Sequence, residues 1–130
     1  FWLAAMDRRV AGTAHLCILG DALPLIGAGQ HERLAPAYVV PGLLRIAEIG
    51  QVAGLVAPRP QLVCLGGTDP LTPEAAHLPA IGRLNAAYDT AGASNQLETF
   101  IDPKTGHGES AEMRVRVLDF LDRAPGLGPV

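Results

Sequence analysis

An aspartate and a histidine follow two short apolar segments, and their side chains can do acid–base chemistry together. Asp69 comes after residues 62–65 and a pair of glycines, and His107 stands between two glycines after residues 97–101. A carboxylate that orients an imidazole allows the imidazole to take the proton of a serine or cysteine nucleophile. The pattern therefore predicts the acid and the base of nucleophilic catalysis, provided that the fold brings the two segment ends together.

Either residue alone also has a structural explanation. Asp69 precedes a proline and could be a turn aspartate, and His107 could be an ordinary loop histidine. At the ends of consecutive strands, the two together favour the catalytic interpretation. Of the other histidines, His15 interrupts an apolar run and predicts a core or strand-edge residue, whereas His77 predicts a surface or helix-capping residue.

The sequence shows no nucleophile motif. Neither Gly-x-Ser-x-Gly nor Gly-x-Cys-x-Gly occurs in the chain, and its two serines, Ser94 and Ser110, lie in a loop and just after the histidine. Cys17 and Cys64 stand in apolar, strand-like runs, where cysteine behaves as a small hydrophobic residue and no disulfide is expected. The chain thus offers an acid and a base but no nucleophile.

The elements that must position the acid and the base are strands of a parallel sheet. Residues 62–65 form an apolar run between a proline and a glycine, which predicts a central strand covered on both faces. Residues 10–19 and 97–101 predict its neighbours. Loops at the carboxyl ends of such strands are where sites are built. We therefore expect an α/β fold of about three parallel strands with flanking helices.

Helical patterns account for most of the remaining chain. Thr72 is expected to cap a helix with Pro73 at its first position, and Gly92 is expected to end it. Two interruptions are predicted, one at Gly50 and one at Pro79, where a main helix should restart. The expected helical segments are residues 1–6, 43–56, 72–91 and 110–123.

Residues 20–41 lose any periodicity and predict a long loop over the site. His31 and Tyr38 in this loop are candidate substrate-binding residues that could line a pocket for the acyl or alcohol part of a substrate. Solvent-exposed loop residues without such a role are the alternative.

Composition limits the classes of function. The chain has 130 residues, 48% of them hydrophobic, which suits one domain with a real core. Its net charge of -3 argues against a nucleic acid or an anionic membrane as a partner. No apolar run is long enough to span a bilayer, and no signal-peptide pattern is visible, so the localisation stays undetermined. We expect neither a cofactor nor a metal.

Five short motifs in order resemble the dienelactone-hydrolase and acetyl-xylan-esterase branch of the α/β-hydrolases. The resemblance covers nearly the whole chain, but only the C-terminal half of the family's domain. The segment that ends near Asp7 is similar to the helix that follows the nucleophile elbow in that family, which would place the elbow upstream of Phe1. The motifs are residues 5–10, 40–45, 57–60, 67–69 and 106–107.

This resemblance implies that residues 1–130 form a partial α/β-hydrolase domain. Its function would be that of a serine hydrolase fragment that cleaves carboxylic esters by acyl-enzyme chemistry, with Asp69 and His107 as the triad acid and histidine. A small-molecule ester would be the substrate, and the N-terminal half of the domain would be the partner without which the chain is inactive. The cysteine nucleophile of dienelactone hydrolases cannot be transferred to Cys64, which lies within a predicted strand. A prolyl-oligopeptidase-type serine peptidase fragment and a noncatalytic scaffold are the alternatives.

Overall fold

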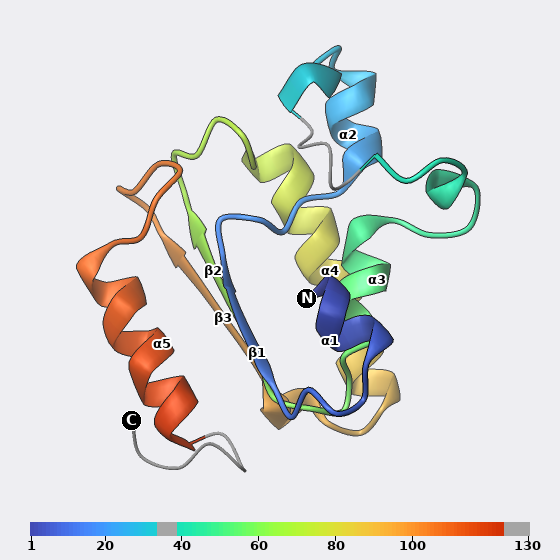
Figure 1. Ribbon diagram of the computed structural model, residues 1–130. Coiled ribbons are helices and arrows are strands. Elements are labelled where there is room, and N and C mark those ends of the chain that lie inside the picture. The colour runs from blue at the N-terminus through green and yellow to red at the C-terminus, as the bar shows by residue number, and fades with distance from the viewer. Residues whose placement is uncertain (34–38, 124–130) are drawn as a thin grey trace.

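The computed structural model describes residues 1–33 and 39–123. A parallel sheet lies at the centre of the molecule, and helices flank it (Figure 1). The sheet has the strand order β1-β2-β3, with β1 at Thr13–Leu16, β2 at Gln61–Gly66 and β3 at Leu97–Asp102. Both strand pairs are parallel. The predicted fold class, three parallel strands with flanking helices, is confirmed.

The described helical elements alternate with these strands. Among them, α4 and α5 are the longest, with 17 and 13 residues. No helix in the described residues is both long enough and apolar enough to cross a membrane. The helical elements are α1 (Trp2–Met6), α2 (Ala22–Gly27), η1 (His31–Arg33), η3 (Leu43–Arg45), α3 (Ile49–Gly54), α4 (Glu74–Thr90), η4 (Ser94–Gln96) and α5 (Ala111–Arg123).

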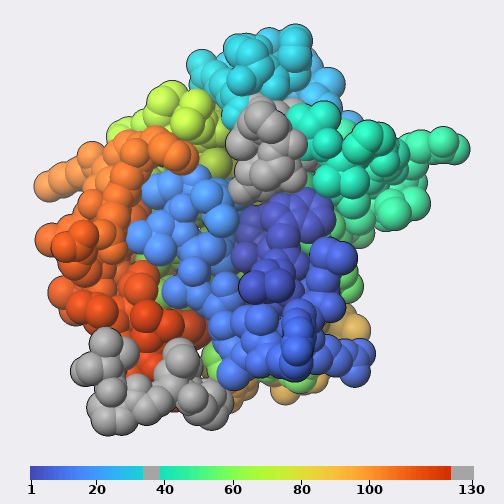
Figure 2. Space-filling model, viewed as in Figure 1, coloured from blue at the N-terminus to red at the C-terminus, as the bar shows by residue number. Residues whose placement is uncertain are grey.

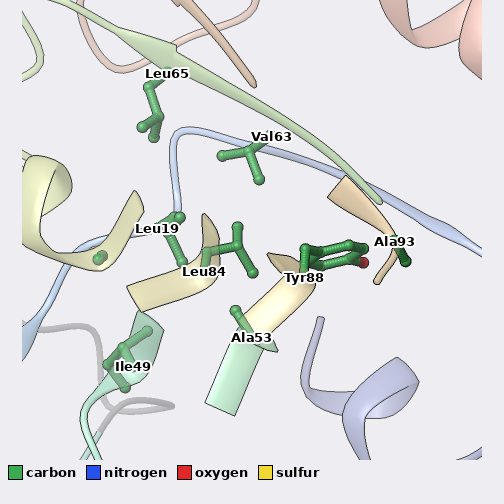
Figure 3. Close-up of a cluster of buried hydrophobic side chains, with 9 residues drawn as sticks. Leu19, Ile49, Ala53, Val63, Leu65, Leu84, Tyr88 and Ala93 are labelled. Atoms are coloured by element: carbon green, nitrogen blue, oxygen red, sulfur yellow. The ribbon is translucent and has the colours of Figure 1, made fainter. Parts of the chain in front are cut away.

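Side chains alternate across β2 and contribute to two cores. Val63 and Leu65 join one hydrophobic cluster, and Leu62 and Cys64 join another, as expected for a strand that is buried on both faces. Figure 1 shows α3 and α4 on one side of the sheet and α5 on the other. The buried cluster on the α3 and α4 side, shown in Figure 3, consists of Leu19, Ile49, Ala53, Val63, Leu65, Ala80, Leu84, Tyr88 and Ala93.

The first strand is shorter than the apolar run that predicted it. Residues 10–19 were expected to be extended, but only Thr13–Leu16 pairs as β1. Cys17 has a φ of 54°, in the left-handed region that non-glycine residues rarely adopt, and this turn ends the strand. Leu19 is nevertheless fully buried, so the apolar run reflects burial beyond the strand.

Helix α4 continues through Pro79, contrary to the predicted restart there. Ala76, Ala80, Leu84 and Tyr88 are all buried, and their spacing of four residues places them on one face of a continuous helix. This face packs on the sheet and on α3. The packing compensates for the backbone hydrogen bond that Pro79 cannot donate.

The two ends of α4 have different outcomes. The N-cap is Pro73 and the helix begins at Glu74, so the predicted cap at Thr72 is wrong by one residue. The predicted stop at Gly92, which has a φ of 66° directly after the helix, is confirmed.

The predicted helix interruption at Gly50 is wrong, because Gly50 lies inside α3. The break falls earlier, between η3 and Glu48, which is the N-cap of α3. A Cβ atom on Gly50 would lie 2.5 Å from the carbonyl oxygen of Ala80. Glycine is therefore needed here because α3 and α4 approach each other closely.

The described part of the expected long loop, residues 20–33 and 39–41, contains the helical elements α2 and η1. Their position depends on contacts between the N-termini of α2 and α3. Asp21, the N-cap of α2, accepts the amide of Gly50 at 2.9 Å, and Glu48 accepts the amides of Ala22 and Leu23 at 2.9 Å each. Each N-cap side chain thus accepts amides of the other helix, although Asp21 and Glu48 are 27 residues apart in the sequence. A capping pattern within one helix therefore does not predict α2.

Candidate active site

The predicted acid and base meet at the carboxyl edge of the sheet. Asp69 follows β2 and His107 follows β3, and the Nδ1 atom of His107 lies 2.9 Å from Oδ2 of Asp69. The carboxylate is buried, whereas 47% of the His107 side chain is exposed. Within residues 1–33 and 39–123, no hydrogen bond engages Nε2 of His107. The geometry that the sequence predicted for this pair is confirmed.

Three donors hold the Asp69 carboxylate in its charged form. Leu71 donates its amide to Oδ1 at 2.8 Å, and Thr72 donates its hydroxyl to Oδ2 at 2.7 Å, beside the bond from His107. Burial acts to raise the pKa of Asp69, but the hydrogen bonds from Thr72, His107 and Leu71 outweigh it, so the pKa lies below its ordinary value. An ionised carboxylate only accepts hydrogen bonds, so Nδ1 of His107 carries a proton. In neutral His107 the exposed Nε2 is then the proton acceptor.

Two glycines allow the acid loop and the histidine loop to run in backbone contact. A Cβ atom on Gly66 would lie 2.1 Å from the carbonyl oxygen of Gly106, and one on Gly67 would lie 2.8 Å from Cα of Pro103. Gly67 also donates its amide to the carbonyl of Asp102 at 2.7 Å. The glycines before Asp69 therefore serve the close approach of the two loops that carry the pair.

Cys17 contacts the histidine loop from the end of β1. Its Sγ atom lies 3.4 Å from the carbonyl oxygen of Gly108 and 3.9 Å from that of Gly106. The thiol is free and buried, as is that of Cys64 within β2. Sequence reasoning treated Cys17 as a strand residue and missed this contact. No signal in the sequence shows that the strand ends there.

The predicted pocket residues have different outcomes. Tyr38 lies outside the residues that the structure describes. His31 is exposed in η1, and its neighbour Arg33 donates from Nη1 to the carbonyl oxygen of Pro70, so η1 lies beside the acid loop. A role for His31 in substrate binding stays a prediction.

Neither of the other two histidines belongs to the pair. His15 is buried in the middle of β1, where its Nε2 lies 3.0 Å from the side-chain nitrogen of Gln61. Burial lowers the pKa of His15 to about 3, so it is neutral, in agreement with the predicted core role. His77 was expected on the surface or as a cap. It is only 2% exposed, which excludes the surface position, and its Nδ1 lies 2.9 Å from the carbonyl oxygen of Thr72.

The described residues contain no group of three or more histidine, cysteine, aspartate or glutamate side chains that could hold a metal ion. A buried carboxylate and an outward-facing imidazole at the carboxyl ends of parallel strands can accept and return one proton.

The parallel sheet with helices on both faces defines an α/β fold, and comparison with known proteins agrees with that class. No family model matches the chain. The chain is 31% identical over 123 residues, 95% of its length, to a Bacillus subtilis (strain 168) protein named "Putative hydrolase YtaP". It spans only 41% of the length of that relative.

Two solved structures share the fold. A crystal structure of TT1662 from Thermus thermophilus matches 92% of the chain with a TM-score of 0.64 and 22% identity, and the match covers 47% of TT1662. Methylesterase BT1017 matches 92% of the chain with a TM-score of 0.58 and 24% identity, over 26% of its own length. At these identities the similarity shows the fold alone.

Proposed function

We propose that this chain is the C-terminal part of an α/β-hydrolase domain that cleaves carboxylic esters through an acyl-enzyme. Asp69 is the catalytic acid of the triad and His107 is its general base. The observation that carries the proposal is the bond of 2.9 Å between Oδ2 of Asp69 and Nδ1 of His107, at the edge of the sheet, with the other side of the imidazole open.

The reaction consists of two acyl transfers, and in each of them one proton passes through His107. His107 Nε2 takes the proton of the nucleophile while the nucleophile forms a bond to the ester carbonyl carbon. The imidazolium then returns the proton to the leaving alcohol as the ester C–O bond breaks, which leaves the acyl-enzyme. In the second transfer His107 takes a proton from water while the water oxygen bonds to the acyl carbon, and the imidazolium returns that proton to the nucleophile as the acyl–nucleophile bond breaks and the acid leaves. Asp69 stays ionised throughout and stabilises the imidazolium, which agrees with its lowered pKa.

The nucleophile and the oxyanion hole are assigned to the N-terminal half of the same domain, which is the proposed partner. Two observations support this. The chain has no nucleophile-elbow motif, and it spans 41% of YtaP and 47% of TT1662. Without that half, the chain alone would not turn over substrate.

The first strand offers a place where the N-terminal half can join the sheet. In the described residues β1 pairs only with β2, and Figure 2 shows the blue segment around β1 at the surface between α1 and α5. A strand of that half, placed beside β1, would complete the backbone pairing along this edge.

A small-molecule ester is the proposed substrate class. The resemblance to the acetyl-xylan-esterase branch supports it, as does the fold shared with Methylesterase BT1017. The same triad also cleaves peptides, so the substrate class needs a direct comparison of ester and peptide turnover.

Reading the coding sequence upstream of Phe1 and expressing the longer protein tests the proposal. We expect a Gly-x-Ser-x-Gly or Gly-x-Cys-x-Gly motif there, hydrolysis of p-nitrophenyl acetate, and loss of about 10⁶-fold in kcat for His107→Ala. Arg9→Ala is the control, because Arg9 is exposed and precedes β1, at the edge of the sheet opposite to the pair. Undiminished turnover by His107→Ala, or an unrelated domain upstream, refutes the proposal, and turnover of peptides alone refutes the ester assignment.

A further inference from the structure

A buried histidine stands behind the catalytic acid and is not used by the proposed reaction. His77, on the first turns of α4, has its Nδ1 atom 2.9 Å from the backbone carbonyl of Thr72. The hydroxyl of the same Thr72 donates to Oδ2 of Asp69 at 2.7 Å. Thr72 is 8% exposed and His77 is 2% exposed, so water does not readily replace either bond. Contacts thus run from His77 through Thr72 to the oxygen that His107 uses.

The orientation of the Asp69 carboxylate depends on these contacts. The last torsion of an aspartate side chain has a broad, twofold energy profile, so the carboxylate plane is set by its hydrogen-bond partners. Oδ1 has the Leu71 amide, and Oδ2 has His107 and the Thr72 hydroxyl. Because the His107 side chain is half-exposed, the Thr72 hydroxyl is the buried donor that keeps Oδ2 turned toward the imidazole.

Thr72 is itself held on three sides. It precedes Pro73, which restricts its backbone to an extended conformation. Its Cγ2 methyl lies 3.6 Å from the position of a Cβ atom on Gly20, so the methyl packs against that segment. His77 donates its amide to the carbonyl of Pro73 at 3.0 Å and its imidazole to the carbonyl of Thr72. The start of α4 is thereby tied to the acid loop.

We propose that Thr72 and His77 are positioning residues that hold the Asp69 carboxylate with Oδ2 directed at His107. Neither touches the reacting atoms, since both act through Asp69. This inference rests on the proposed function for its catalytic meaning, but the geometry that it explains can be measured without any turnover.

The first test uses the longer protein with the variants Thr72→Val and Thr72→Ser. Valine keeps the shape and removes the hydroxyl, whereas serine keeps the hydroxyl and removes the methyl. Long-range ¹H–¹⁵N correlation spectra report which nitrogen of His107 carries the proton. We expect Thr72→Ser to retain the Nδ1–H form with its downfield proton, and Thr72→Val to give a mixture of tautomers with rapid exchange of that proton.

The second test uses His77→Asn and His77→Phe. The asparagine amide can still donate to the Thr72 carbonyl, and the phenylalanine ring fills the space without a donor. In the longer protein we expect His77→Phe to lower kcat about ten- to a hundredfold with little change in KM, and His77→Asn to restore most of it. The same order should appear in the His107 spectra of that protein.

Leu84→Ala is the control for a merely structural effect, because it opens the core away from the acid loop. It should lower the melting temperature and leave the His107 tautomer unchanged. The proposal is overturned if Thr72→Val and His77→Phe keep the wild-type tautomer, or if Leu84→Ala changes it equally. Should Thr72→Val fail to fold, the two His77 variants decide in the same way.

The two proposals fail separately. Spectra that change as expected, in a longer protein that hydrolyses no ester, leave the positioning roles intact and refute the hydrolase function. Ester hydrolysis with unchanged spectra does the reverse.

Discussion

Replacing Asp69 by asparagine should convert His107 to the wrong tautomer without unfolding the protein. The Leu71 amide needs an acceptor at the Oδ1 position, so the asparagine oxygen stays there and its NH₂ group takes the place of Oδ2. The Thr72 hydroxyl can rotate and accept from this group. His107 must then accept at Nδ1, which moves its own proton to Nε2. An imidazole protonated at Nε2 cannot deprotonate a nucleophile on that side.

The expected magnitude follows from this exchange. In a Ser-His-Asp triad the same substitution lowers kcat about 10⁴-fold through the wrong tautomer. This corresponds to about 5.5 kcal/mol of lost transition-state stabilisation. The stability cost should be smaller, about 1–3 kcal/mol, because the Leu71 amide keeps its acceptor and the buried Thr72 hydroxyl loses the one it had.

Two measurements check the prediction. Steady-state hydrolysis of an aryl ester by the longer protein gives kcat, and ¹⁵N spectra of the same protein give the tautomer. Asp102→Asn is the matched control, because Asp102 lies at the end of the adjacent strand and its carboxylate accepts the amide of Lys104. Asp69→Asn with at least a tenth of wild-type kcat, or with the Nδ1–H tautomer retained, would refute the reasoning.

Three further predictions concern stability and association. The pKa of His15 is about 3 in the folded chain and about 6.5 in the unfolded chain, so between these pH values only the unfolded chain binds the proton. The free energy of unfolding should therefore fall by about 1.4 kcal/mol per pH unit as the pH drops from about 6.5 to about 3. Urea titrations at several pH values should show this slope in the wild type and not in His15→Gln. Gly50→Ala should destabilise the chain by about 1–3 kcal/mol, since its Cβ atom would lie 2.5 Å from a backbone oxygen, whereas Gly82→Ala, with no atom within 4 Å, should be neutral or stabilising; equal melting temperatures contradict this. The unpaired edge of β1 and exposed apolar side chains such as Leu3 and Met6 should make the isolated chain associate and bind a hydrophobic dye, which sedimentation tests; a compact, dye-free monomer would favour the scaffold alternative.

The central strand, the order of the sheet elements and the Asp69–His107 pair could be predicted from the sequence because each depends on local pattern. An apolar run between proline and glycine indicates a buried strand wherever it occurs, and parallel strands place their carboxyl ends on one edge. The final helix, expected at residues 110–123 and found at Ala111–Arg123, also follows from its own periodicity.

Tertiary contacts decided the rest. Helix α2 begins where Glu48, far along the chain, accepts its first amides, and α4 passes Pro79 because its buried face is continuous. Gly50 resembles a helix breaker in the sequence and is a packing residue in the fold. In each case the energy that selects the structure comes from a partner distant in sequence, which local propensity does not contain.

The same division holds within the site. Asp69 and His107 could be recognised from the sequence, because a carboxylate and an imidazole at the ends of consecutive strands suit acid–base chemistry. The contacts of Thr72, His77 and Cys17 with these two residues and their loops appeared only in the folded chain. A threonine before a proline, a buried histidine and a buried cysteine have ordinary local explanations. Their roles depend on which oxygen or carbonyl lies within about 3 Å of each donor, and only the packing of the loops sets that distance.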